Sequence, residues 1–174
     1  MPTVPNNYGG LEKKYSSYNT AKIVILPIPF DKTSTWGKGA DKGPSAIIKA
    51  SQNMELYDIE TKSEIYQNGI FTAKPIKEKT SASMIERTYN VTKKLLADKK
   101  FVVTLGGEHS ISQGPIKAFV ERYKNLSILH LDAHSDRRES YDGTKFSHAC
   151  IMARAEEMVN NVVSIGVRSL DASE

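Results

Sequence analysis

Residues 101–136, FVVTLGGEHSISQGPIKAFVERYKNLSILHLDAHSD, contain two short apolar runs separated by a helical pattern. The runs FVVTL and LSILHL are rich in β-branched and aliphatic residues and read as buried strands. Between them, apolar residues recur at the i, i+3, i+4, i+7 spacing of one helix face, at Ile116, Phe119, Val120 and Tyr123. The order strand, helix, strand predicts a parallel unit in which both strands end at the same edge of a sheet.

The same alternation extends over most of the chain. KIVILPI at residues 22–28 predicts a buried strand that Pro27 and Pro29 end, and Pro44 suits the first turn of a helix over residues 45–57. A helix is also expected around Met84, Thr88, Val91 and Leu95, with Ser83 and Glu86 as a capping box. Shorter elements are expected as a strand over residues 64–70, a helix over 149–159 and a strand over 161–167.

Composition describes an ordinary globular chain of 174 residues, with 39% hydrophobic and 25% charged residues. The net charge of +4 is spread along the sequence instead of forming a basic stripe, which argues against nucleic acid as a partner. The longest apolar run, IVILPIPF, is too short to span a bilayer, so no membrane partner is expected. The single cysteine fits a reducing compartment, and we expect a cytoplasmic protein.

The first twenty residues are polar and carry no periodic pattern. We therefore expect residues 1–20 to form a flexible amino-terminal arm, and residues 21–174 to form one folded unit. Alternating strands and helices in that unit predict the α/β class, with a parallel sheet and helices on its faces. Ligands of such sheets bind beyond the carboxyl ends of the strands.

Titratable residues gather at two of those strand ends. Asp132, His134 and Asp136 are spaced by two, so an extended backbone would point all three to one side. Carboxylates with an imidazole suit a divalent ion such as Mn²⁺, and His109 could add a ligand beside Gly106 and Gly107, which allow close backbone approach. Such a set could hold two ions and generate a bridging hydroxide. A strand-end hydrogen-bond cluster is the alternative, as is helix capping for His109.

Three motifs together resemble the ureohydrolase family of arginases and agmatinases, and are closest to agmatinases. They are GGEHS at residues 106–110, LDAHSD at 131–136 and SYDGTKFSHAC at 140–150. The loop PIPFDKTSTWGKGADKGPSAI and the segment SIGVRS extend the resemblance over nearly all of residues 21–169. The resemblance implies a three-layer α/β/α sandwich around a parallel sheet, a dinuclear manganese centre and hydrolysis of a guanidino group to urea and an amine.

The resemblance also assigns roles to single residues. His109 and Asp136 would bind the first manganese ion, His134 the second, and Asp132 would bridge the two. His148 would carry a proton to the leaving amine, although packing at a helix start is its other interpretation. His130 receives no metal by resemblance and is expected in the core or behind the ligands.

One family motif is absent from these 174 residues. The family's third motif, a strand followed by spaced aspartates that bind both metals, has no counterpart, and neither has the acidic residue that binds the guanidinium. The chain thus resembles the amino-terminal three-fifths of a ureohydrolase, with the carboxy-terminal strands missing. Those later strands would lie between the strand before GGEHS and the strand before LDAHSD, so both edges would be unpaired. We expect the chain to be inactive alone.

Two classes of function remain open. The first is an agmatinase that releases putrescine and urea, forming homotrimers or hexamers when complete. Guanidinobutyrate or arginine are alternative substrates, and a guanidino acid would be favoured if Arg137 or Lys145 faced the entrance. The second class is a non-catalytic subunit that pairs through its open sheet edge with a full-length relative.

Overall fold

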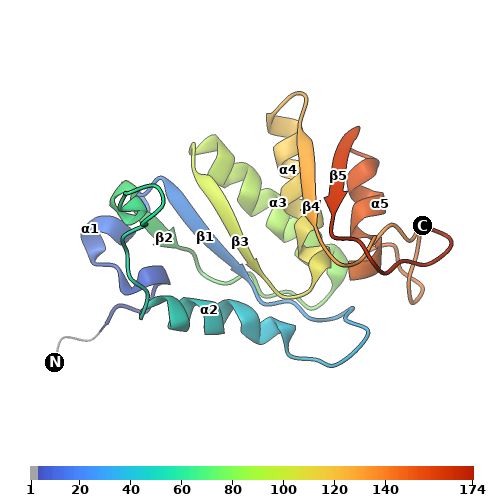
Figure 1. The fold of residues 1–174 in the computed structure, drawn as a ribbon, viewed down its shortest axis with the longest axis horizontal. Coiled ribbons are helices and arrows are strands. Elements are labelled where there is room, and N and C mark those ends of the chain that lie inside the picture. Colours follow the sequence, from blue (N-terminus) through green and yellow to red (C-terminus); the bar gives the residue numbers. More distant parts are fainter. Residues whose placement is uncertain (1–3) are drawn as a thin grey trace.

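Strand β1 (Ile23–Ile28) lies at the centre of a three-stranded parallel sheet in a computed structural model that describes residues 4–174 (Figure 1). Its neighbours are β2 (Ile70–Thr72) on one side and β3 (Phe101–Gly106) on the other. Residues 23–28 pair in parallel register with residues 101–106 along the whole length of β1. The β-branched run in the sequence therefore forms a buried parallel strand, as predicted, and it is the central strand of this sheet.

The two faces of this sheet bury different clusters. Val24, Leu26 and Ile28 face helix α3 (Ser81–Ala97), where they meet Met84 and Leu95. On the opposite face, Ile25 packs with Leu11 and Ile70, and tyrosines from the amino-terminal segment and the 56–66 region cover them. Cover on both faces gives this half of the protein the three layers of an α/β/α sandwich.

A second parallel sheet pairs β4 (Ser127–Leu131) with β5 (Asn161–Ile165). Ile128 and Val162 pack on α5 (Ile151–Glu156) and on Ile116 of α4 (Gln113–Arg122). The other face carries four large apolar residues that are between 55% and 69% exposed, namely Leu129, Leu131, Val163 and Ile165. This half therefore has helices on one face only (Figure 1).

Strands β3 and β4 belong to separate sheets, and neither pairs on its other edge within residues 4–174. This arrangement confirms the expectation that the two strands preceding the histidine motifs have unpaired edges. The halves are joined instead through α3 and α4, whose backbones approach closely at Gly114. A Cβ on Gly114 would lie 2.4 Å from the carbonyl oxygen of Ile85, so only glycine fits there.

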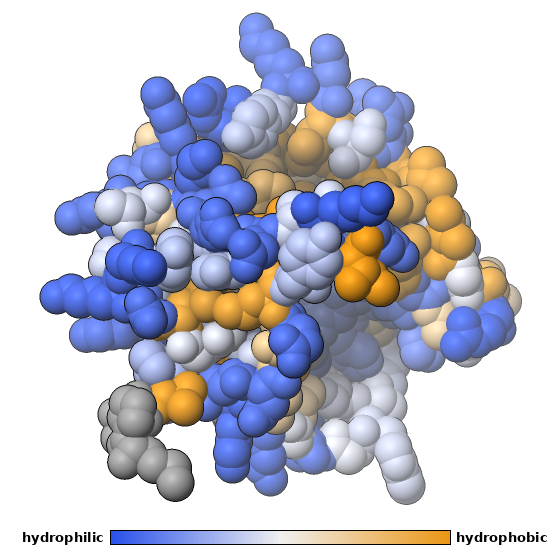
Figure 2. All heavy atoms as spheres, turned by 60° about the vertical axis from the view of Figure 1, so that its left-hand side comes forward, coloured by the Kyte–Doolittle hydropathy of each residue, from blue (hydrophilic) through white to orange (hydrophobic). Residues whose placement is uncertain are grey.

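The remaining helices are short. Besides α1 (Lys13–Ser16) and α2 (Gly43–Ser51), five single 3₁₀ turns occur within the described residues, at Tyr8–Gly10, Ala40–Lys42, Ile65–Asn68, His109–Ser112 and His148–Cys150. Among residues 4–174, no helix is long and apolar enough to cross a membrane. Polar side chains cover much of the face in Figure 2, with apolar residues gathered toward its right-hand edge.

Several local expectations need correction. Helix α2 ends at Ser51 instead of residue 57, and the strand expected over residues 64–70 is a 3₁₀ turn followed by β2. Thr80, not Ser83, caps α3, because its side chain accepts a hydrogen bond from the backbone nitrogen of Ser83 at 3.2 Å. On α4, the buried positions are Gly114, Pro115 and Ala118 instead of the larger apolar residues of the predicted stripe.

The amino-terminal segment differs from the flexible arm expected over residues 1–20. Residues 1–3 lie outside the described residues, but Leu11 is buried in the cluster beside β1 and β2. Lys100 donates hydrogen bonds of 2.7 and 2.6 Å to the carbonyl oxygens of Tyr18 and Ala21. The Tyr18 hydroxyl also bonds Asp98 at the end of α3. These contacts attach the segment to the body of the protein.

Candidate metal centre

The loops that follow β3 and β4 bring the two histidine motifs together. Gly107 makes this possible, because a Cβ at that position would lie 1.9 Å from the carbonyl oxygen of Phe30. The backbone at Gly107 can therefore pass directly against Phe30, just after the end of β1, before it enters the 3₁₀ turn that begins at His109. The close backbone approach predicted for the glycine pair is confirmed at this position.

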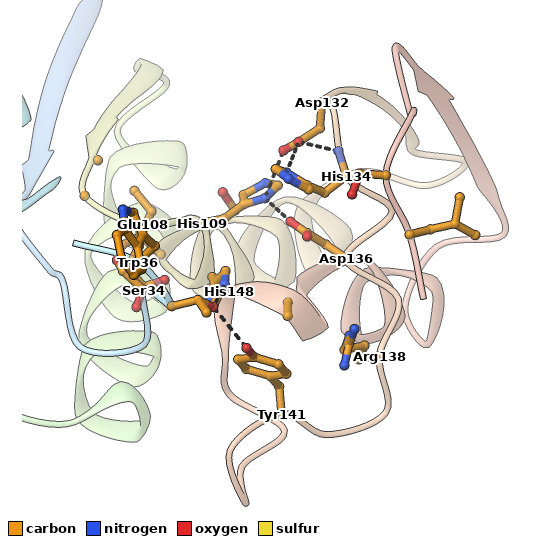
Figure 3. A pocket seen from close by; sticks show the side chains of 18 of the residues that line it. Ser34, Trp36, Glu108, His109, Asp132, His134, Asp136, Arg138, Tyr141 and His148 are labelled. Carbon is orange, nitrogen blue, oxygen red and sulfur yellow. Dashed lines mark hydrogen bonds and ion pairs between the residues drawn. The ribbon is translucent and has the colours of Figure 1, made fainter. Parts of the chain in front are cut away.

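A compact cluster forms where the two loops meet (Figure 3). His109 Nδ1 lies 2.8 Å from Asp136 Oδ2 and 3.5 Å from Asp132 Oδ2. One ligand atom from each of His109, His130, Asp132 and Asp136 can be chosen so that all four lie within 4.8 Å of one another. Three of the four ligands predicted from the sequence therefore share one site.

His134 lies outside this cluster, whereas His130, which is buried as expected, takes part in it. The His134 side chain is 64% exposed at the rim, with Nδ1 3.3 Å from Asp132 Oδ1. His130 is buried, and its Nε2 lies 3.5 Å from Asp132 Oδ2 without a hydrogen-bond partner in the described residues. Burial, followed by the neighbouring His109, lowers the pKa of His130 below its ordinary value.

The backbone departs from the extended form expected over Asp132, His134 and Asp136. Asp136 has a φ of 54°, in the left-handed region, and its carbonyl oxygen accepts a 2.9 Å hydrogen bond from the Met152 backbone. This turn directs the Asp136 carboxylate back toward His109, while His134 stays at the surface. Although Asp132, His134 and Asp136 are two positions apart, their side chains therefore do not all point to one side.

Electrostatics favour an ionised Asp132. Burial raises its pKa, but the backbone N–H of His134 and the nearby imidazoles of His109 and His130 outweigh that effect, and the pKa lies below its ordinary value. The His134 backbone nitrogen donates to Asp132 Oδ1 at 2.8 Å, which leaves Oδ2 directed at the cluster. A carboxylate with one free oxygen is suited to a cation.

His148 lies on the same cavity but apart from the cluster, facing Tyr141 (Figure 3). Its backbone nitrogen donates to Thr33 Oγ1 at 3.0 Å, and its Nε2 lies 3.2 Å from Thr35 Oγ1. The ring of Tyr141 meets the imidazole edge-on, with 5.7 Å between centroids. The loop after β1 therefore holds this side chain, a contact that no local sequence signal indicates.

The cavity between these groups has a volume of about 760 Å³. Arg138 lines this cavity, although no sequence pattern singles the residue out. Its guanidinium lies 3.1 Å from the Asp171 carboxylate and 3.8 Å from the Glu174 carboxylate. Arg137 does not line it, since its Nε pairs with Glu156 at 2.8 Å, and Lys145 extends along Phe146 instead. Neither cation considered for a guanidino acid therefore faces the cavity.

The residues present fit a divalent metal. Ligand atoms of two carboxylates and two imidazoles lie within 4.8 Å of one another, and the buried Nε2 of His130 has no hydrogen-bond partner among the described residues. Carboxylate and imidazole ligands without thiolates suit Mn²⁺ or a similar ion. The cluster is thus a candidate site for a divalent ion, with His130 in it and His134 at its rim.

The fold and the cluster together define a class, that of parallel α/β proteins with a candidate metal site at the carboxyl ends of their strands. Residues 21–174 match the family model described as the arginase family. The chain belongs to this family.

The relatives agree with that assignment. The chain is 30% identical to the N(1)-aminopropylagmatine ureohydrolase of Synechocystis over 98% of its own length, and 35% identical to the agmatinase of Bacillus cereus over 90%. The structure of agmatine ureohydrolase from Thermoplasma volcanium superposes with a TM-score of 0.89 at 30% identity, covering 99% of this chain. The chain spans 60%, 56% and 58% of these three proteins, respectively.

Proposed function

We propose that this chain contributes the first part of a dinuclear manganese hydrolase that cleaves a guanidino group to urea and an amine. The observation that carries the proposal is the convergence of His109, Asp132 and Asp136 on a cavity that His148 also lines. Membership of the arginase family supports the same chemistry.

The proposed ligands are those that the motifs imply. His109 and Asp136 would hold one ion, His134 the other, and Asp132 would bridge them. The exposed His134 lies beside Asp132 Oδ1, whereas His109 lies beside Asp132 Oδ2, which suits two neighbouring ions. Bound divalent ions would supply water activated for attack at neutral pH. Other ligands for the ions would come from a longer polypeptide, as the share of the relatives' length suggests.

His148 would supply the proton that the leaving amine needs. An amine departs readily only when protonated, and an imidazole is the side chain best suited to give a proton near neutral pH. His148 lines the cavity, and its ring nitrogens contact hydroxyl groups of Thr33, Thr35 and Ser147.

Agmatine is the proposed substrate. Relatives named agmatinase support it, and the relative named N(1)-aminopropylagmatine ureohydrolase makes that longer polyamine the second candidate. The cavity offers Asp171 and Glu174 beside Arg138, so the positive charge of Arg138 is offset. This charge balance favours a cationic substrate over guanidinobutyrate or arginine.

The test is urea release by the protein purified from its native cell, after its intact mass has been compared with 19.3 kDa. We expect Mn²⁺-dependent urea release from agmatine, slower release from 4-guanidinobutyrate, and two manganese ions per chain. A single weakly bound ion with no urea release from any of these substrates would favour the non-catalytic subunit. The expected homotrimer or hexamer and the cytoplasmic location stay predictions, to be checked by mass photometry and cell fractionation.

A further inference from the structure

We propose that Thr33 is a positioning residue that selects which ring nitrogen of His148 carries the proton. This inference rests on the proposed role of His148 as a proton carrier. Thr33 lies in the loop after β1 and reaches a histidine 115 positions later in the chain. The contact brings the Thr33 hydroxyl to Nδ1 of the imidazole, while Nε2 contacts Thr35.

The direction of the Thr33 hydroxyl is set by Glu108. This glutamate is buried, and its Oε2 accepts a 2.7 Å hydrogen bond from the backbone nitrogen of Ser110. Its Oε1 lies 2.8 Å from Thr33 Oγ1 and 3.3 Å from the Thr33 backbone nitrogen. A carboxylate only accepts hydrogen bonds, so the single hydroxyl proton of Thr33 points to Glu108.

Thr33 Oγ1 therefore offers only lone pairs to His148. It accepts the backbone N–H of His148 at 3.0 Å, and His148 Nδ1 lies 3.3 Å from it. This second contact is a hydrogen bond only when Nδ1 carries the proton. Ser147 Oγ, 3.2 Å from the same nitrogen, can donate or accept and does not impose a choice. The Glu108–Thr33 pair thus selects the Nδ1–H tautomer of the neutral ring.

Nε2 is then the nitrogen that gains and loses the proton. It lies 3.2 Å from Thr35 Oγ1, which in turn lies 3.2 Å from the Tyr141 hydroxyl. In the structure the Thr35 hydroxyl donates to the Tyr141 hydroxyl, so Thr35 Oγ1 is free to accept from Nε2 when the ring is protonated. When Nε2 gives up its proton, both hydroxyls turn, so that Tyr141 donates to Thr35 and Thr35 donates to Nε2. Both states are satisfied by two hydroxyl rotations, and no further proton moves.

The experiment is nitrogen-15 NMR of the imidazole rings in the 174-residue chain, compared with a Thr33→Val and a Thr33→Ser variant. We expect the neutral His148 ring of the unsubstituted chain to be mainly in the Nδ1–H form. Thr33→Val keeps the size but removes the hydroxyl, so the population should shift at least several-fold toward Nε2–H. Thr33→Ser keeps the hydroxyl and should restore the starting ratio, whereas Ser147→Ala should leave it unchanged.

A neutral His148 mainly in the Nε2–H form in the unsubstituted chain would overturn the proposal, even if Thr33→Val fails to fold. An unchanged ratio in a folded Thr33→Val variant would overturn it too. The signals of the other three histidines report whether each variant is folded. Because the readout needs neither metal nor turnover, a lack of urea release would count against the proposed function and leave this assignment intact.

Discussion

His109 Nδ1 lies 2.8 Å from Asp136 Oδ2, although the two residues follow strands of different sheets. No hydrogen-bonded ladder joins β3 to β4 within the described residues, so sheet register does not set this distance. Packing of α3 on α4 at Gly114 and the left-handed turn at Asp136 set it instead. The candidate metal centre is therefore held by helix packing and loop conformation.

Replacing Asp136 by asparagine should weaken manganese binding. The substitution removes a charge that faces His109 and leaves the side-chain size unchanged. Loss of a residue that only hydrogen-bonds a metal ligand typically lowers metal affinity by about 10–100-fold. Because Asp136 is proposed as a ligand itself, we expect its substitution to lower the affinity for Mn²⁺ at least as much. Isothermal titration with Mn²⁺ measures it. Asp142→Asn, in an exposed turn, is the control, and equal affinity of the two variants would remove Asp136 from the ligand set.

Replacing Gly107 by alanine should destabilise the fold. The new Cβ would collide with the carbonyl oxygen of Phe30 at 1.9 Å, and backbone cannot move aside as a flexible side chain can. Gly37→Ala is the control, because an added Cβ there contacts no other atom. Its only cost is that an alanine must adopt the φ of 67°, which destabilises the fold by about 1–2 kcal/mol. Chemical unfolding should show a larger loss of free energy of unfolding for Gly107→Ala. A smaller loss would mean that the loop relaxes freely.

The sequence is most informative about the strands and about the strand ends. Continuous β-branched runs predict β1, β3, β4 and β5 to within about two residues, because burial on the sheet requires such side chains. Ligands of parallel α/β proteins bind beyond the carboxyl ends of the strands, and this rule indicates that His109 and Asp132 lie close together, although their strands belong to separate sheets. The strands and their ends are thus predicted best, whereas the buried stripe expected on α4 is wrong.

Side-chain direction in the loops could not be predicted. Arg137 and Arg138 are adjacent, yet Glu156 holds one away from the cavity and Asp171 holds the other at it. Their partners lie far along the chain, so no local pattern indicates which arginine faces inward. The same holds for His148, whose ring is oriented by Thr33 across a long sequence separation. Tertiary contacts, not local propensity, set these directions.

The loop that carries Thr33 should depend on an ionised Asp31. Asp31 Oδ2 accepts backbone hydrogen bonds from Gly39 at 2.7 Å and Ala40 at 3.0 Å, and Ser34 also donates to its carboxylate. Burial raises the pKa of Asp31, but these hydrogen bonds outweigh it, so the pKa lies below its ordinary value. The stabilisation is therefore present above the unfolded pKa of about 4 and is lost as pH falls through the folded value.

Asp31→Asn tests this pH dependence. We expect it to lower the free energy of unfolding at pH 7 by about 1.5–3 kcal/mol, the range for hydrogen bonds to charged groups. The difference from the unsubstituted chain should shrink as pH falls below about 4, since the aspartate is then protonated too. Urea unfolding at a series of pH values measures it, with the exposed Asp41→Asn as control. A difference that stays constant with pH would exclude the carboxylate charge as the cause.

Cys150 should be unreactive in the folded protein. Its side chain is fully buried at the start of α5, and burial raises the pKa of the thiol, so little of the reactive thiolate forms. We expect iodoacetamide to label it slowly in buffer and rapidly in denaturant. The matched control is a Cys150→Ser/Ser140→Cys double variant, which carries its one thiol on an exposed loop residue and should react quickly in both conditions. Slow labelling of Cys150 in buffer would show that the 3₁₀ turn beginning at His148 is part of the stable core. Labelling as fast as that of the control would show instead that this segment opens readily, so that oxidation of Cys150 could disturb the neighbouring His148.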